Sequence, residues 1–520
     1  MGKIFGALIT LVLALGTVAP GVMAFSKDSL TWKKCTTCHE VKDGKISRVE
    51  ELRTTPEEWV VIVDRMVRLH GMELKPSEMN PLIKELCSTQ GLTAEEAEQV
   101  KYLDLYNNPQ NVETPRANDP EKLFVTCVRC HSAGKIYSYR MTESAWGKLR
   151  DFHLYTTPTV IGQMREMKWV PEADAVLAEL AKSQPYGSAL KPSKISPAGS
   201  WLILGYEPGK GNYRGQATIK NGTNGDYDVT GSLQYADGHS ESFFGDASLY
   251  GGSAFRTNVR QNGNATSGAY ALTDGVLHGQ HSFPAPNFRT STSSWYPQNG
   301  KAQVLKVSPA YLVSGETTTL VLEGTNLPQV KAADVQISGG SIKIISAKQL
   351  DAAALELQVL YQGKGSEQAK LKVKGLDAGS LNLVSQVDYI AITPELGRAR
   401  VDGGQNFPAE GVQFDAIAYS KGLKADDSAD DVALGPVAAK FNLSELVTRP
   451  GDDDLVWLGA IGAAGTYLPT SAYGPIEMRE FHVEGIGLVK VEAEYQRGDQ
   501  SYKAEARLVV TVPDYIPRIK

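Results

Sequence analysis

The stretch that decides the fold is residues 35–39, Cys-Thr-Thr-Cys-His, because the same spacing returns at residues 127–131 as Cys-Val-Arg-Cys-His. Two thiols separated by two residues can form thioethers with the two vinyl groups of a haem, and the adjacent imidazole then lies beneath the iron. The repeated motif therefore predicts two covalently bound haem c groups. The expected attachment residues are Cys35, Cys38, Cys127 and Cys130, and the expected proximal iron ligands are His39 and His131.

Other uses of paired cysteines fit this pattern less well. A structural zinc site would assemble both pairs into one cluster and would not require a histidine after each pair. A redox-active pair would be expected in a thioredoxin-like βαβ unit, which the surrounding sequence lacks. Cys87 is left over, and we expect it to be a buried thiol.

The sixth ligand of the first iron has several candidates. An electron-transfer haem usually has two strong axial ligands, such as histidine or methionine. His70 is favoured because it ends an apolar helical face that begins after the capping sequence at Thr55, where an imidazole is otherwise unexpected. Met66, Met72 and Met79 remain alternatives.

For the sixth ligand of the second iron, a weak internal repeat indicates the candidate. Residues 70–86 align without gaps on residues 164–180. This alignment places Met164 where His70 lies, and Met164 is the favoured ligand. The competing side chains are Met167, Met141 and His153. Because methionine raises a haem potential relative to a second histidine, electrons are expected to run from the first haem to the second.

Outward from the motifs, composition changes divide the chain. Residues 1–24 have a positive start, a short apolar core and a small-residue end, as in a secretory signal; an uncleaved anchor is the alternative. Helical spacing marks a region at 25–190. Turn dipeptides and alternating strands then predict a barrel or sandwich at 195–302 and immunoglobulin-like sandwiches at 303–388 and 389–520. The expected fold class is an N-terminal all-α dihaem cytochrome c domain followed by about three antiparallel all-β domains.

Composition excludes several function classes. The 520-residue chain has a net charge of -6, which gives no basic field for nucleic acid. No segment after the signal approaches the roughly 18 apolar residues of a membrane span. We therefore expect an exported protein without a membrane span or nucleic-acid partner. No nucleophile–base set stands out, so no catalytic residue is expected on this chain.

With its signal, residues 32–40 (WKKCTTCHE), second haem motif and β region in this order, the sequence resembles the alpha subunit of quinohemoprotein amine dehydrogenase. The resemblance implies the haem subunit of a heterotrimeric periplasmic enzyme. A β-propeller subunit and a small subunit carrying cysteine tryptophylquinone would be its partners. Primary amines would be oxidised at the quinone to aldehyde and ammonia, and the haems would pass electrons one at a time to a blue-copper protein or cytochrome c.

Two other functions remain open from the sequence. A dihaem peroxidase would need one haem with an open or displaceable distal position. A non-catalytic dihaem carrier would use its β domains for docking, since sandwich folds alone do not determine function. A quinone-bearing partner would distinguish the amine dehydrogenase from this carrier.

Overall fold

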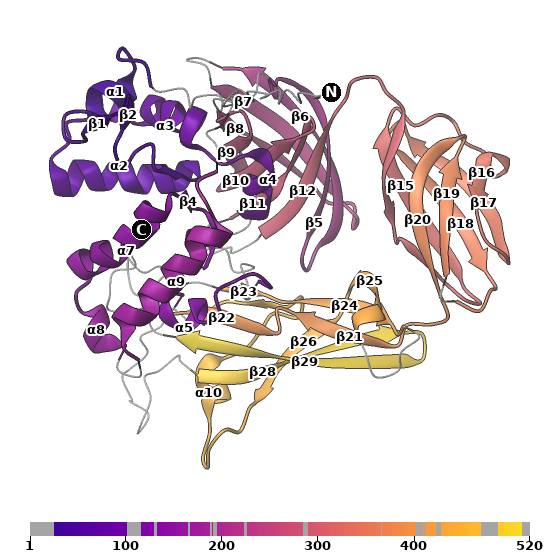
Figure 1. Ribbon diagram of the computed structural model, residues 1–520. Coiled ribbons are helices and arrows are strands. Elements are labelled where there is room, and N and C mark those ends of the chain that lie inside the picture. The colour runs from indigo at the N-terminus through magenta and orange to yellow at the C-terminus, as the bar shows by residue number, and fades with distance from the viewer. Residues whose placement is uncertain are drawn as a thin grey trace, which may run out of the picture.

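The fold is a helical region followed by three strand-rich regions (Figure 1). The computed structural model describes residues 25–100, 116–128, 133–164, 167–187, 190, 195–222, 226–283, 290–365, 367–401, 409, 411–422, 428–469 and 487–511. The expected signal at 1–24 lies outside these residues. The division at 25–190, 195–302, 303–388 and 389–520 stays a prediction.

The helical region is built from two similar halves, defined here as residues 25–100 and 116–187. In each half a long helix opens on a threonine N-cap: Thr55 accepts from Glu58 N at 3.4 Å, and Thr142 accepts from Ala145 N at 3.2 Å. The first half contains α1 (Leu30–Cys35), α2 (Pro56–His70), α3 (Pro76–Gln90) and α4 (Ala94–Val100). The second contains α5 (Leu123–Thr126), α6 (Ala133–Tyr137), α7 (Glu143–Thr156), α8 (Val160–Gln163) and α9 (Trp169–Ser183).

In each half, a buried tryptophan of one long helix is hydrogen-bonded to the end of another. Trp59 of α2 donates its indole N–H to the carbonyl oxygen of Gln90 at 3.0 Å, at the end of α3. Trp146 of α7 donates to the carbonyl oxygen of Gln184 at 3.1 Å, the C-cap residue of α9. Both indoles are only 2% exposed, so each satisfies its one polar group within an apolar core.

Short strands join the halves and complete the helical region. β1 (Val41–Lys42) and β2 (Lys45–Ile46) form a hairpin directly after the first haem motif. β3 (Leu52–Arg53) pairs antiparallel with β4 (Arg140–Met141), so Leu52 lies opposite Met141 and Arg53 opposite Arg140. This two-residue ladder connects the first half to the second.

The central region is a closed eight-stranded antiparallel barrel. Its hairpins use turn dipeptides expected from the sequence: Asn262-Gly263 and Asp274-Gly275 both have positive φ. The interior is filled by a core that includes Tyr213, Phe255 and Trp295, as expected for a barrel of this size. The strands are β5 (Gly199–Glu207), β6 (Gly211–Asn221), β7 (Tyr227–Tyr235), β8 (Ser240–Tyr250), β9 (Ala254–Gln261), β10 (Asn264–Thr273), β11 (Val276–Ser282) and β12 (Thr290–Pro297).

The third region is a sandwich of two four-stranded sheets, in the orders β13-β15-β18-β17 and β14-β20-β19-β16. Leu320, Leu357 and Leu381 are completely buried in the core. The strands are β13 (Gln303–Ser308), β14 (Tyr311–Val313), β15 (Thr317–Thr325), β16 (Val335–Ile337), β17 (Ile342–Asp351), β18 (Ala354–Tyr361), β19 (Glu367–Val373) and β20 (Leu376–Val384).

The last region also packs two main sheets, β21-β24-β25 and β22-β29-β28-β26, with a small β23–β27 pair. Phe414 and Val489 lie at the centre of its core. The elements are β21 (Tyr389–Thr393), β22 (Leu396–Arg400), β23 (Val412–Gln413), β24 (Asp415–Ser420), β25 (Val432–Val437), β26 (Lys440–Glu445), α10 (Asp454–Leu458), β27 (Thr466–Tyr467), β28 (Gly487–Arg497) and β29 (Gln500–Thr511).

The expected fold class is wrong in two respects. The described residues are about 22% helix and 46% strand, and the helical region itself contains β1 to β4, so it is not an all-α domain. The β regions are not purely antiparallel either, because β14 pairs parallel with β20 and β22 pairs parallel with β29. Two-residue strands are too short to show alternation in a sequence, and the pattern of a strand does not reveal the direction of a distant partner.

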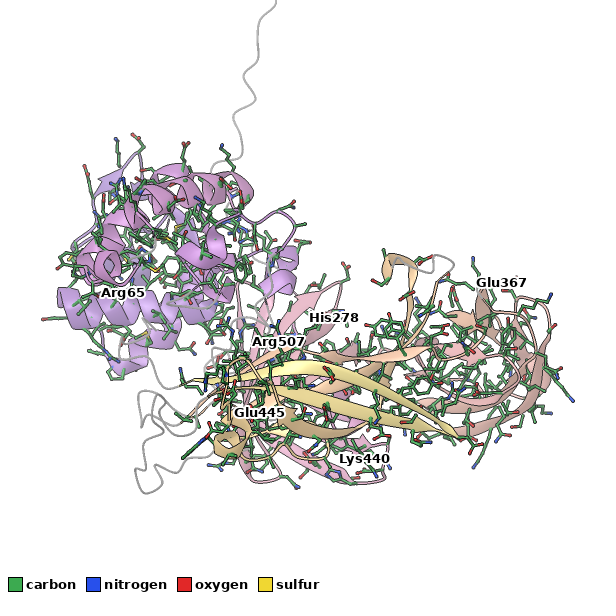
Figure 2. All side chains as sticks on the ribbon, turned by 90° about the horizontal axis from the view of Figure 1, so that it is seen from below. Arg65, His278, Glu367, Lys440, Glu445 and Arg507 are labelled. Atoms are coloured by element: carbon green, nitrogen blue, oxygen red, sulfur yellow. The ribbon has the colours of Figure 1, made fainter. Side chains whose placement is uncertain are left out.

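The helical region is attached to the barrel by polar contacts. Glu57 of α2 forms an ion pair with Arg256 of β9, and Lys84 of α3 forms one with Asp226, just before β7. Tyr250 donates to Asn80 at 2.8 Å. Figure 2 shows Arg65 in the helical region at one end of the molecule and Glu367 of the sandwich at the other. Within the described residues, no helix has the length and apolar character needed to cross a membrane.

Candidate haem sites

The first cysteine motif begins at the end of α1, which α3 fixes in place. The Glu85 carboxylate of α3 accepts hydrogen bonds from the backbone N–H groups of Leu30 at 3.1 Å and Thr31 at 2.7 Å. It also accepts one from the Thr31 hydroxyl at 2.9 Å. An anion at a helix N-terminus satisfies donors that have no partner within the helix. The position of Cys35 at the other end of α1 is thereby set.

A tight turn gathers the members of the first motif. The backbone N–H groups of Cys38 and His39 both donate to the carbonyl oxygen of Cys35, at 3.2 and 2.9 Å. Cys35 is half-buried, Cys38 is exposed, and neither is in a disulfide. Burial, followed by the negative charges of Glu85 and Cys38, raises the pKa of Cys35 to about 11, so Cys35 is a thiol at neutral pH. Two thiols and an imidazole on one turn fit the requirements of haem attachment.

The His39 ring lies in surroundings that favour the neutral imidazole. Burial lowers its pKa most, and the nearby charges of Arg48 and His70 lower it further, while a hydrogen bond to the Ser47 backbone acts in the opposite direction. Histidines that bind a metal through one ring nitrogen commonly make a hydrogen bond of this kind through the other, because it fixes the orientation of the ring. Neutral imidazole is the form that binds iron. The residues present at the first motif therefore fit a haem.

The charge of His70 contributes to lowering the pKa of His39. His70 is the last residue of α2, and the helix ends there because Gly71 takes the left-handed conformation, with φ of 69°. The N–H of Gly71 and that of Met72 both donate to the Met66 carbonyl oxygen. His70 is exposed at this helix end. Among the alternative ligands, Met72 and Met79 pack against the core of the first half.

The second motif is only partly described. Cys127 is half-buried and caps α5, whereas Cys130 and His131 lie outside the described residues. The segment just before Cys127 is tied to α9 by Trp169, whose indole donates to the carbonyl oxygen of Thr126 at 3.1 Å. Trp169 therefore contacts the residue that directly precedes Cys127.

Two predicted distal candidates lie beside Trp169. Met164, the C-cap of α8, is 3% exposed and belongs to the same small core as Trp169, with Met167 packed against it. The His153 ring centroid lies 5.8 Å from that of Trp169. The Nδ1 of His153 donates to the Leu149 carbonyl oxygen at 2.6 Å, and burial lowers the pKa of this histidine. The geometry places both side chains at one site, so the choice of Met164 stays a prediction.

Met141 has a different role from the other candidates. It lies in β4, opposite Leu52, and is 4% exposed within the core of the second half. Its side chain is therefore part of the packing between the halves.

Sequence reasoning missed the charged cluster that joins the two halves. Arg53 donates two hydrogen bonds to the Glu96 carboxylate, at 2.7 and 2.8 Å, and Arg140 lies 3.3 Å from the same group. A signal was present: Arg-x-Thr-x-x-x-Trp occurs at residues 53–59 and again at residues 140–146. We call Arg53, Glu96 and Arg140 the seam cluster.

Two other side-chain sets have structural explanations. His278 and His281 both belong to β11, and they point to opposite faces of the barrel wall because three positions separate them along the strand. His281 is 7% exposed, whereas His278 contacts the Ser294 hydroxyl at 2.8 Å. Cys87 is 1% exposed in the core of the first half, and burial raises the pKa of its thiol strongly.

Several solved structures are distantly similar to parts of this chain. A redesigned β-barrel, mFAP1, bound to DFHBI is 12% identical, with 19% of this chain and 93% of that chain covered and a TM-score of 0.18. The protocadherin gamma B2 extracellular cadherin domains 3–6 are 12% identical, covering 50% and 57%, with a TM-score of 0.18. Yersinia pseudotuberculosis InvD is 9% identical, covering 59% and 97%, with a TM-score of 0.14. No curated protein sequence matched.

Protein-family models account for most of the chain. Residues 26–190 match the haem-binding region described as quinohemoprotein amine dehydrogenase A, alpha subunit. Residues 195–285 match domain II of the quinohemoprotein amine dehydrogenase alpha subunit, and residues 390–519 match its domain IV. The three models come from one subunit and follow one another in order. The chain therefore belongs to the family of quinohemoprotein amine dehydrogenase alpha subunits.

Proposed function

We propose that this chain is the electron-transfer subunit of a periplasmic amine dehydrogenase. It would receive electrons from a quinone in a partner subunit and deliver them to a blue-copper protein or cytochrome c. The observation that carries the proposal is the first motif, where Cys35, Cys38 and His39 share one turn. Membership of a haem-binding amine dehydrogenase family supports it.

The side chains of this motif would have distinct tasks. The Cys35 and Cys38 sulfurs would attach a haem through thioethers, and the imidazoles of His39 and His70 would bind its iron. Bound there, a c-type haem supplies reversible one-electron transfer. Cys127, Cys130, His131 and Met164 would perform the same tasks at the second site.

The number of attachment motifs matches the proposed reaction. Oxidation of a primary amine with water gives an aldehyde, ammonia, two protons and two electrons. A chain with two one-electron sites can take up both electrons, one at each site. The oxidation itself would occur on the quinone-bearing subunit, next to a β-propeller subunit, which is consistent with our expectation that this chain has no catalytic residue.

The test uses the complex isolated through this chain from its native periplasm. A simple primary amine is added without oxygen, and the absorption of reduced haem is followed. We expect reduction of about two haems per chain, and two further subunits that are absent when the chain is expressed alone. Absence of reduction by any primary amine, together with absence of partners, would contradict the proposal.

A further inference from the structure

The seam cluster is a buried contact in which two arginines share one carboxylate. Arg53 binds Glu96 with two nitrogens, while the Nε of Arg140 lies 3.3 Å from Oε1 of the same group. The exposed fractions of the side chains are 2% for Arg53, 10% for Arg140 and 20% for Glu96. At these depths water screens charges poorly, so their effects extend further than those of surface charges.

The two arginines occupy equivalent places in the repeat. They lie opposite each other in the β3–β4 ladder, and each lies two residues before the threonine that caps α2 or α7. Glu96 comes from α4, which contributes Ala97 and Val100 to the core of the second half. One carboxylate therefore contacts equivalent points of both halves.

The other donors of the arginines hold the ends of the long helices. Arg53 donates to the carbonyl oxygens of Tyr186 at 2.8 Å and Gly91 at 3.1 Å. Arg140 donates to the Tyr137 carbonyl oxygen at 2.8 Å and to the Gln184 side chain at 3.0 Å. Gly91 follows α3 and Gln184 follows α9, so the cluster connects corresponding helix ends.

Glu96 is ionised at neutral pH. Burial opposes its ionisation, but hydrogen bonds from Arg53 and the Thr93 backbone, with the charges of Arg53 and Arg140, keep the pKa of the carboxyl below its ordinary value. Without this carboxylate, two buried guanidinium groups would face each other uncompensated.

We propose that Glu96 is a positioning residue for electron exchange between the two halves: it holds them in their symmetric relation and sets the electrostatic field at both haem sites together. This inference rests on the proposed two-haem function. Leu52, the neighbour of Arg53, packs against the core that contacts Cys35 and also against the core that contacts Cys127. The cluster therefore lies between the two candidate sites, and a change in its charge would act on both. Loss of the negative charge would favour the reduced state at both.

The test compares Glu96→Gln with Glu95→Gln in the complete haem-loaded complex. Glu95 is the adjacent, exposed residue of α4, and its substitution removes the same charge. Midpoint potentials are measured by spectroelectrochemical titration. We expect E96Q to raise both potentials, E95Q to change neither, and Glu96→Asp to restore values near those of the wild type.

The reverse change provides a second test if E96Q does not fold. Arg140→Gln removes a positive charge from the same cluster and should lower both potentials. The proposal is overturned if E96Q gives the same two potentials as E95Q, or if only one of the two potentials changes. If neither E96Q nor Arg140→Gln assembles, E96D decides the matter. An E96D complex with wild-type stability but changed potentials would then overturn the proposal. A merely stabilising contact would lower the melting temperature without this paired shift.

Failure of the proposed function would be recognised separately. Wild-type complex with fewer than two haems, or without reduction by an amine, would contradict the dehydrogenase function. The effect of Glu96 on the potentials is measured with electrodes and needs no amine.

Discussion

The two halves of the haem-binding region share a scaffold but differ where the expected distal ligands lie. In both, a threonine caps a long helix, a tryptophan donates to the carbonyl oxygen at the end of the following 15-residue helix (α3 or α9), and an arginine belongs to the seam cluster. In the first half, α2 ends at His70 and α3 follows after a short loop. In the second, α8 and Met164 are inserted between α7 and α9.

This difference distinguishes the residues that stabilise the fold of each half from those expected to set the haem potential. The repeated residues are buried and hydrogen-bonded, so substitution there affects the packing of a whole half. The connection after the long helix is less constrained, and its length and ligand can differ. With the proposed ligands, one scaffold would present histidine at one site and methionine at the other.

The largest expected effect is the loss of one haem at a time. Replacing both cysteines of one motif, as in Cys35→Ala with Cys38→Ala, should reduce haem content from two per chain to one, because both thioethers are lost. The same should follow for Cys127→Ala with Cys130→Ala. Haem content is measured from the spectrum of the pyridine complex in alkali.

Cys87→Ala is the control, since this thiol is buried in the core and belongs to neither motif. It should keep both haems. If either double variant retained two covalent haems, the assignment of that motif would be wrong.

The next effect concerns the shared scaffold. Trp59→Ala and Trp146→Ala should each cost about 3–5 kcal/mol in the free energy of unfolding, because each leaves a cavity at a buried indole. The two Trp→Phe variants should cost less, about 0.5–1.5 kcal/mol for the lost hydrogen bond. Thermal unfolding followed by circular dichroism checks both pairs. Very unequal costs would show that the halves are not equivalent in packing.

Exchange of the expected distal ligands should change the free energy of unfolding less than the tryptophan variants do, but it should shift the midpoint potentials of the haems. His70→Met should raise the potential of the first haem, and Met164→His should lower that of the second, because methionine favours reduced iron. Redox titration of each variant measures this. Met167→Leu should leave the spectrum unchanged; loss of a methionine–iron band in that variant would reassign the ligand to Met167.

The smallest effect is a pH dependence in the second half. Burial lowers the pKa of His153, so the folded protein keeps it neutral while the unfolded chain takes up a proton below pH about 6.5. This contribution to stability is present at neutral pH and is lost as pH falls through 6.5 towards the lower folded value.

His153→Gln should therefore lose less melting temperature than the wild type when pH is lowered from 7 to 5. A Gln variant with the same acid sensitivity would exclude this contribution. A changed haem spectrum in the variant would instead assign His153 as the distal ligand.

Some of this organisation could be read from the sequence. The Cys-x-x-Cys-His spacing and the Thr55 cap are local, because the chemistry depends on residues a few positions apart. The turn dipeptides of the barrel are local for the same reason. The family also followed from the order of these segments, and the family models confirm it.

The remainder depends on contacts between distant segments. The pairing of Arg53 with Arg140 joins residues in different halves, and no hydrophobic period reveals a ladder of two residues. The parallel pairing of β22 with β29 likewise joins strands at the two ends of one region. Such partners are chosen by packing, which a single segment does not encode.

We propose that the two haems have different distal ligands, and the most direct test is a redox titration of the wild-type complex with a full spectrum at each potential. We predict two one-electron waves, with a methionine–iron band that disappears on reduction of the higher-potential haem only. A single wave, or the same ligand signature for both haems, would contradict the account.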